Sequence, residues 1–67
     1  MASRIVIVHG RKGRKYLGKP ASVAEILEMF GENIESAIVL INGKPATSDK
    51  KAKPGDKVYI MPVCAGD

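Results

Sequence analysis

The chain has 67 residues, of which 45% are hydrophobic, 27% are charged and 4% are aromatic, and its formal net charge is +4. This composition indicates a globular domain. A chain this short buries only about 60% of its unfolded surface, which leaves little room for an enclosed active site. Cys64 is the one cysteine and His9 the one histidine, which argues against an internal disulfide and a zinc site. We expect no bound metal or cofactor.

The first predicted element is a strand over residues 5–8, Ile-Val-Ile-Val, which is β-branched and precedes His9 and Gly10. Residues 11–15, Arg-Lys-Gly-Arg-Lys, have the glycine and the charges of a hairpin loop, so the return strand is predicted to begin at Tyr16. For His9 we expect a packed or strand-end role, because no nucleophile lies near it in the sequence.

A helix is predicted to follow Ser22, which has the properties of an N-cap, with Glu25 completing a capping box three residues later. Apolar residues then recur at i, i+3, i+4 and i+7 and form one stripe: Val23, Ile26, Leu27 and Phe30. Gly31 is predicted to end the helix in the left-handed conformation.

The second half of the chain is predicted to be mostly β-structure. Residues 37–41 form an apolar strand, and Asn42 and Gly43 a tight turn that requires positive φ. Residues 47–53 are expected to form an exposed, lysine-rich connection. After the turn at residues 54–56, an alternation of apolar residues predicts a last strand over residues 58–63.

These elements predict an α+β fold. One apolar helix stripe requires one apolar surface, so the helix is expected to cover one face of the sheet, and the last strand to pair beside the first. This is the ubiquitin-like β-grasp arrangement, with a mixed four- to five-stranded sheet packed on one helix. We expect the domain to span residues 1–63 and residues 64–67 to form a flexible C-terminal tail.

Three segments carry a family resemblance: residues 22–27 (Ser-Val-Ala-Glu-Ile-Leu), residues 39–44 (Val-Leu-Ile-Asn-Gly-Lys), and residues 54–63, which end in Ile-Met-Pro-Val. Together with the small residues that follow, they resemble the MoaD/ThiS group of ubiquitin-like sulfur carriers. The resemblance covers nearly the whole chain.

The resemblance implies a carrier and not an enzyme. A ubiquitin-activating-type partner uses ATP to adenylate the C-terminus of such a carrier, which then becomes a thiocarboxylate that donates sulfur. The pathways that use this scaffold are molybdopterin or tungstopterin synthesis, thiamine synthesis, tRNA thiolation and protein conjugation, and some include a downstream synthase. We expect a cytoplasmic protein without membrane contact, since no signal-peptide pattern and no apolar run of about 20 residues is present. We also expect a monomer.

The end of the sequence departs from the family pattern. Members of the group end in Gly-Gly, whereas this sequence ends in Ala65, Gly66 and Asp67. Glycines let an extended backbone enter a narrow channel without side-chain clashes. Three hypotheses remain open: a matched partner accepts Asp67, Asp67 is removed to expose Gly66, or the chain has lost carrier chemistry and is a binding module. Nearby Cys64 is either a small hydrophobe or part of a sulfur relay, and nothing in the sequence supplies a base or cation to activate it.

Two surfaces are candidate binding sites. If Val58 and Ile60 point toward the helix, the pleat places one apolar set on the outer face: Leu40, Tyr59, Met61 and Val63. By resemblance, such a face contacts the activating partner. The first hairpin carries the second candidate set: Arg11, Lys12, Arg14 and Lys15. This set has three interpretations: a contact to RNA phosphates, a dock for an acidic partner, or an ordinary solvated loop. With Tyr16 as the one nearby ring, base stacking would be weak, so RNA is the less favoured partner.

Overall fold

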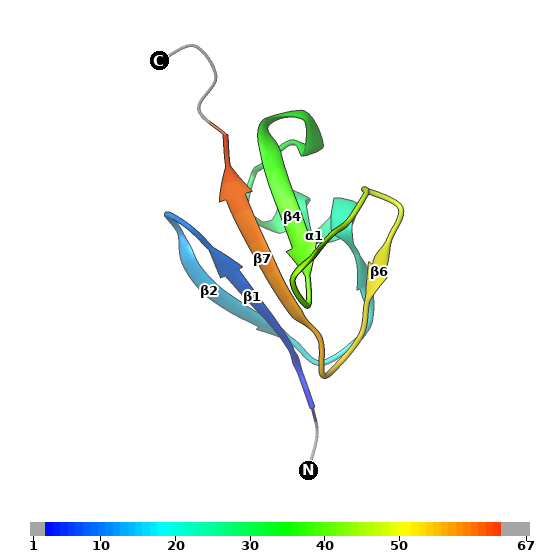
Figure 1. Cartoon of the computed structure of the whole chain (residues 1–67). Helices are drawn as coiled ribbons and strands as arrows, with labels where there is room; N and C mark the ends of the chain where they lie inside the picture. The colour runs from blue at the N-terminus through cyan, green and yellow to red at the C-terminus, as the bar shows by residue number, and fades with distance from the viewer. Residues whose placement is uncertain (1–2, 64–67) are drawn as a thin grey trace.

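The computed structural model describes residues 3–63, and over this range the chain forms a mixed five-stranded sheet with one α-helix packed behind it (Figure 1). The strands of this sheet are β1 (Ile5–His9), β2 (Gly13–Leu17), β4 (Ala37–Ile41), β5 (Lys44–Pro45) and β7 (Lys57–Pro62). The other elements are β3 (Ala21–Ser22), α1 (Val23–Met29), the 3-10 helix η1 (Ile34–Ser36) and β6 (Lys51–Ala52). This α+β architecture is the predicted ubiquitin-like β-grasp fold. The predicted tail, residues 64–67, lies outside the described residues.

The strand order is β2-β1-β7-β4-β5, so the strand latest in sequence lies at the centre of the sheet. β7 pairs in parallel with β1, from Val6 opposite Lys57 to His9 opposite Ile60, and antiparallel with β4. The prediction that the last strand pairs beside the first is therefore confirmed. Because β1 and β7 run in the same direction, the turn after β1 lies next to the point where the chain leaves β7.

The core lies between the sheet and α1. Alternate residues of β1 and β7 face the helix and are fully buried: Ile5, Ile7, Val58 and Ile60. The helix contributes its predicted stripe, in which Val23, Ile26, Leu27 and Phe30 are all buried. The 3.6-residue and two-residue periodicities of the sequence thus meet in a single apolar layer.

Both ends of α1 have the predicted caps. The Ser22 hydroxyl accepts from the Glu25 N–H at 3.2 Å, and the Glu25 carboxylate accepts from the Ser22 N–H at 2.9 Å. At the other end Gly31 has φ +69°, a conformation that costs glycine little because it lacks a Cβ.

The predicted loop over residues 11–15 is wrong in its second half. Gly13, Arg14 and Lys15 belong to β2, and Gly13 pairs with His9 across a tight turn. β2 is an edge strand whose first four residues are exposed. Charged side chains are common on edge strands, where they discourage pairing with other chains, so the charges did not indicate a loop.

The predicted exposed connection over residues 47–53 also needs correction. Within it, β6 pairs with β3, and Ala52 is fully buried. The carbonyl groups of Lys50 and Ser48 accept from the N–H groups of Val23 and Ala24 at 2.8 and 3.1 Å. Those N–H groups lie in the first turn of α1, where no carbonyl of the helix itself can accept from them. The segment therefore packs on the helix start, with its lysine side chains toward solvent.

Two turns are joined at the end of the sheet where β7 begins. Asn42 and Gly43 have φ of 53° and 85°, which confirms the predicted tight turn. The Asn42 side chain donates to one oxygen of Asp56 and accepts from the Lys57 N–H, both at 3.0 Å. The other oxygen of Asp56 accepts from the Lys53 N–H at 3.0 Å. The hydrogen bond from this N–H and the one from Asn42 hold the pKa of Asp56 below its ordinary value.

We expect Asp56→Asn to weaken the dependence of stability on acid pH. A lowered folded-state pKa means that ionised Asp56 stabilises the fold above its unfolded pKa of about 4 and loses this contribution as the pH falls further. The variant should therefore be less stable than wild type at pH 7 and approach it near pH 2, as measured by urea unfolding across pH. Glu28→Gln is the control, because the Glu28 side chain makes no hydrogen bond or ion pair with residues 3–63; an equal effect of both changes would contradict the prediction.

Candidate functional site

The face of the sheet that α1 leaves uncovered carries exposed apolar side chains. Leu40 lies directly opposite Tyr59 and Ile38 opposite Met61 in the β4–β7 ladder, so all four point away from the helix. Tyr59 and Met61 are 37% and 38% exposed, Ile38 is 47% exposed and Leu40 is half-buried. We call these four residues, with exposed Val63 just beyond β7, the apolar patch.

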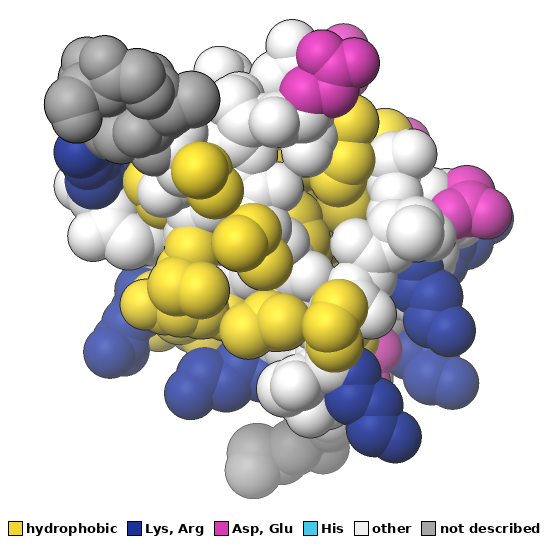
Figure 2. Space-filling view, turned by 45° about the horizontal axis from the view of Figure 1, so that its top comes forward, with side chains coloured by type: hydrophobic (Ala, Val, Ile, Leu, Met, Phe, Trp, Pro, Cys, Tyr) yellow, Lys and Arg dark blue, Asp and Glu magenta, His cyan; other side chains and the backbone are white. Residues whose placement is uncertain are grey.

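The predicted face residues Leu40, Tyr59, Met61 and Val63 thus lie near one another, and their role in binding stays a prediction. Ile38 was missed, although the alternation that places Leu40 outward also places Ile38 outward. Figure 2 shows hydrophobic side chains gathered on this part of the surface, with lysine and arginine side chains along the border. A shallow hollow lies at the end of the patch remote from Val63, and it is lined by Leu40, Asn42, Gly43, Lys57 and Tyr59.

The predicted basic set has side chains on both faces of the sheet. Arg14 lies opposite Val8, whose side chain is on the open face, whereas Lys15 lies opposite buried Ile7 on the helix side. The Lys15 ammonium lies 5.6 Å from the centre of the Phe30 ring. Lys12 also turns toward the helix end, where its ammonium donates to the Phe30 carbonyl. Arg14 and Lys15 thus lie on opposite faces of the sheet, and the role of the basic set in binding stays a prediction.

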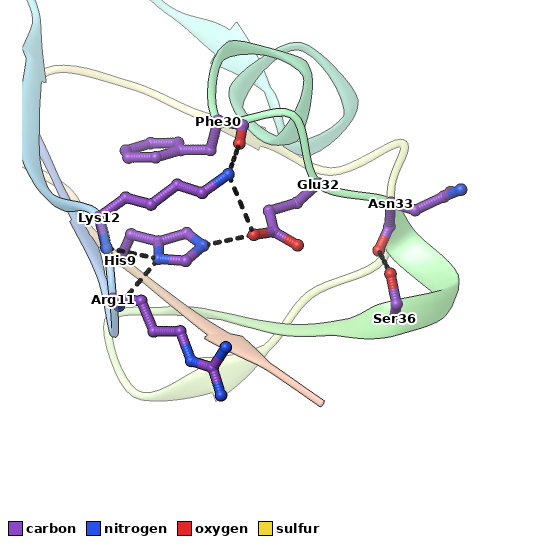
Figure 3. A network of polar contacts seen from close by, with 7 residues as sticks. All are labelled: His9, Arg11, Lys12, Phe30, Glu32, Asn33 and Ser36. Carbon is purple, nitrogen blue, oxygen red and sulfur yellow. Dashed lines mark hydrogen bonds and ion pairs between the residues drawn. The ribbon is translucent and has the colours of Figure 1, made fainter. Parts of the chain in front are cut away.

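His9 is buried at the end of β1, with 3% of its surface exposed (Figure 3). This agrees with the predicted packed role. Its Nδ1 accepts from the N–H groups of Arg11 and Lys12, both at 3.0 Å. Because Nδ1 accepts, the proton lies on Nε2, which donates to Glu32 Oε2 at 2.7 Å. The ring also stacks on Phe30 with the centroids 5.1 Å apart. Every polar atom of this imidazole therefore has a partner.

Glu32 is the second member of this part-buried contact, and we name the pair the His9–Glu32 bridge. The hydrogen bond from His9, followed by the positive charge of Lys12 at 3.7 Å, keeps the pKa of Glu32 below its ordinary value. Sequence reasoning missed the pair. The two residues are 23 positions apart, and no periodicity links them. Only the packing of the β1–β2 turn against the end of α1 brings them together.

The chain leaves β7 between two other segments. On one side the Gly10 N–H donates to the Ile60 carbonyl at 3.0 Å, and on the other the Val63 N–H donates to the Ser36 carbonyl at 2.8 Å. Cys64 and the predicted reactive residues Ala65, Gly66 and Asp67 come next in the sequence, and all four lie outside the described residues. We call the segment from Ile60 to Val63 the tail exit.

Residues 3–63 contain neither a metal-binding cluster nor a membrane-spanning helix. In this range no three histidine, cysteine, aspartate or glutamate side chains lie close enough together to hold a metal ion. In the same range no helix is both long and apolar enough to cross a membrane.

The comparison with protein families matches the model described as the ThiS family over residues 10–66, from the turn after β1 to the glycine after β7. The chain belongs to the ThiS family. ThiS-family proteins are small sulfur carriers that generally work with adenylating enzymes. In this ThiS-family protein the match includes Gly66 and stops before Asp67.

Proposed function

We propose that this ThiS-family protein carries sulfur as a thiocarboxylate at its C-terminus. The observation that carries the proposal is the family match, which runs from the turn after β1 through β7 and reaches Gly66. A carboxylate oxygen of the chain end attacks the α-phosphate of ATP, and pyrophosphate leaves. A sulfide sulfur then displaces AMP from the acyl adenylate, so that one sulfur replaces one oxygen. ATP and the catalytic groups belong to an adenylating enzyme of the ubiquitin-activating type.

The described residues supply docking and placement. The apolar patch is an exposed surface that includes Met61 and Val63 of the tail exit, and its aromatic and methionine side chains are types enriched in protein interfaces. A partner that covers the patch holds the chain end near its own active site, which raises the effective concentration of the carboxylate there. We further propose that the sulfur serves thiamine, molybdopterin or tRNA thiolation chemistry, with a downstream synthase in some of these pathways.

Asp67 leaves three forms of the proposal. A matched adenylating enzyme accepts the aspartate, or a peptidase removes it and exposes Gly66, or the chain has kept the fold as a non-carrier binding module. Asp67 lies beyond the family match, so the match does not distinguish the three forms.

Intact mass after incubation with ATP, a sulfur source and an extract of the native cells separates these forms. A mass change of one sulfur for one oxygen is expected for the carrier, and prior loss of Asp67 marks processing. Omission of ATP is the control, because adenylation must precede sulfur transfer. An unchanged mass under all conditions would contradict carrier chemistry and favour the binding module.

A further inference from the structure

Two segments form hydrogen bonds to the tail exit from opposite sides. The turn that follows β1 holds Ile60 through the Gly10 N–H, and a Cβ placed on Gly10 would contact the Pro62 ring at 3.5 Å. The segment that follows α1 and ends in η1 holds Val63 through the Ser36 carbonyl. The direction in which the chain leaves the domain therefore depends on where these two segments lie relative to each other.

The His9–Glu32 bridge ties the same two segments together (Figure 3). His9 fixes the first segment internally, because its Nδ1 accepts from the N–H groups of Arg11 and Lys12 at 3.0 Å. Glu32 begins the second segment, and its N–H donates to the Leu27 carbonyl at 2.9 Å, which anchors it to α1. Lys12 adds a second link, since its ammonium reaches both the Phe30 carbonyl and Glu32.

The bridge is built from a buried histidine that satisfies two N–H groups of the turn through Nδ1 and reaches Glu32 through Nε2. A buried polar side chain lowers stability unless its hydrogen bonds are satisfied, and an apolar residue would pack beside Phe30 without that requirement. A charge-assisted hydrogen bond between two segments fixes their separation and orientation more narrowly than apolar contact does. This geometric constraint acts between the two segments that hydrogen-bond to Ile60 and Val63.

We propose that His9 and Glu32 are positioning residues that fix the course of the chain at the tail exit for activation of its C-terminus. This inference rests on the proposed function in its link to activation. An acyl group reacts efficiently only when it is held close to the attacking atom in the right orientation, so a loosened exit lowers the rate even when docking is intact.

Hydrogen exchange measured by NMR tests the structural part with Glu32→Ala. We expect exchange of the Gly10 and Val63 amides to rise about tenfold, because one charge-assisted hydrogen bond is lost, while amides in the middle of β1 and β7 keep their protection. Glu32→Gln should stay near wild type, since the amide oxygen still accepts from His9 Nε2. Glu28→Ala is the control for loss of a carboxylate from the same region. Unchanged exchange at Val63, or an equal rise throughout the sheet, would overturn the proposal.

Activation kinetics with the adenylating enzyme test the functional part. Glu32→Ala should lower kcat about tenfold with little change in KM, because no side chain of the apolar patch is replaced, and Glu32→Gln should restore kcat. If exchange at Val63 rises while kcat stays at the wild-type value, the link to activation is wrong. If wild type itself is not activated, the proposed function fails, and the exchange data still decide whether the bridge holds the tail exit.

Discussion

Replacing both Leu40 and Met61 with aspartate is expected to abolish binding to the adenylating enzyme. Both side chains lie on the open face, so an apolar contact there would be replaced by two carboxylates that the partner surface would have to desolvate. We expect the affinity to fall by more than about 100-fold, as when central interface residues are lost. Isothermal titration calorimetry with the purified enzyme measures the change.

The matched control for this double change is Met29→Asp on α1. Met29 is 39% exposed, close to the exposure of Met61, but it lies on the other side of the molecule. Its replacement should leave the affinity near that of wild type, and circular dichroism should show that all variants are folded. Wild-type affinity in the double variant would show that the enzyme docks elsewhere.

Ile60→Ala is expected to cause the largest loss of stability among single truncations. Ile60 is fully buried in the central strand, between its neighbours on β1 and β4 and beneath α1. Truncation of a buried isoleucine to alanine costs about 2–5 kcal/mol, and the free energy of unfolding of a small domain is about 5 kcal/mol or little more. Urea unfolding should therefore show a midpoint shifted far toward zero denaturant, with a partly unfolded population in buffer.

Ile38→Ala tests whether burial is the reason. Ile38 has the same side chain on the neighbouring strand, but it is 47% exposed on the open face. We expect a loss below about 1 kcal/mol for this change. If the two truncations were equally damaging, the assignment of inner and outer faces to β4 and β7 would be wrong.

The sequence was most informative where several local signals coincided. The helix had a capping box at Ser22, an apolar stripe and Gly31, and each of these is present in the structure. Residues 11–15 and 47–53 were misjudged because a run of lysine and arginine indicates exposed side chains and does not distinguish a loop from an edge strand. Ala52 gave no local sign of burial. It pairs with Ala21, which lies 31 positions earlier in the sequence in a strand of two residues.

The sequence also predicted one part of the candidate site and missed another. Alternation along residues 58–63 and 37–41 was sufficient to place Tyr59, Met61 and Leu40 on one face, because the pleat is a local property of a strand. The His9–Glu32 bridge was beyond sequence reasoning, since it depends on how the turn after β1 packs against the end of α1. The polar contact on which the proposed positioning role depends is therefore visible only in the folded chain.

The central place of β7 has a consequence for biosynthesis. During translation the ribosome releases residues 3–52 while β7, the strand that joins β1 to β4, is still missing. The β1–β2 hairpin and the β4–β5 pair therefore cannot yet form one sheet. Pairing of β1 with β7 closes a long stretch of chain, which makes sheet completion a late and comparatively slow step. The residues after Val63 are attached to the strand that completes the sheet. An adenylating enzyme that recognises the β4–β7 face would thus select finished molecules over nascent or misfolded ones.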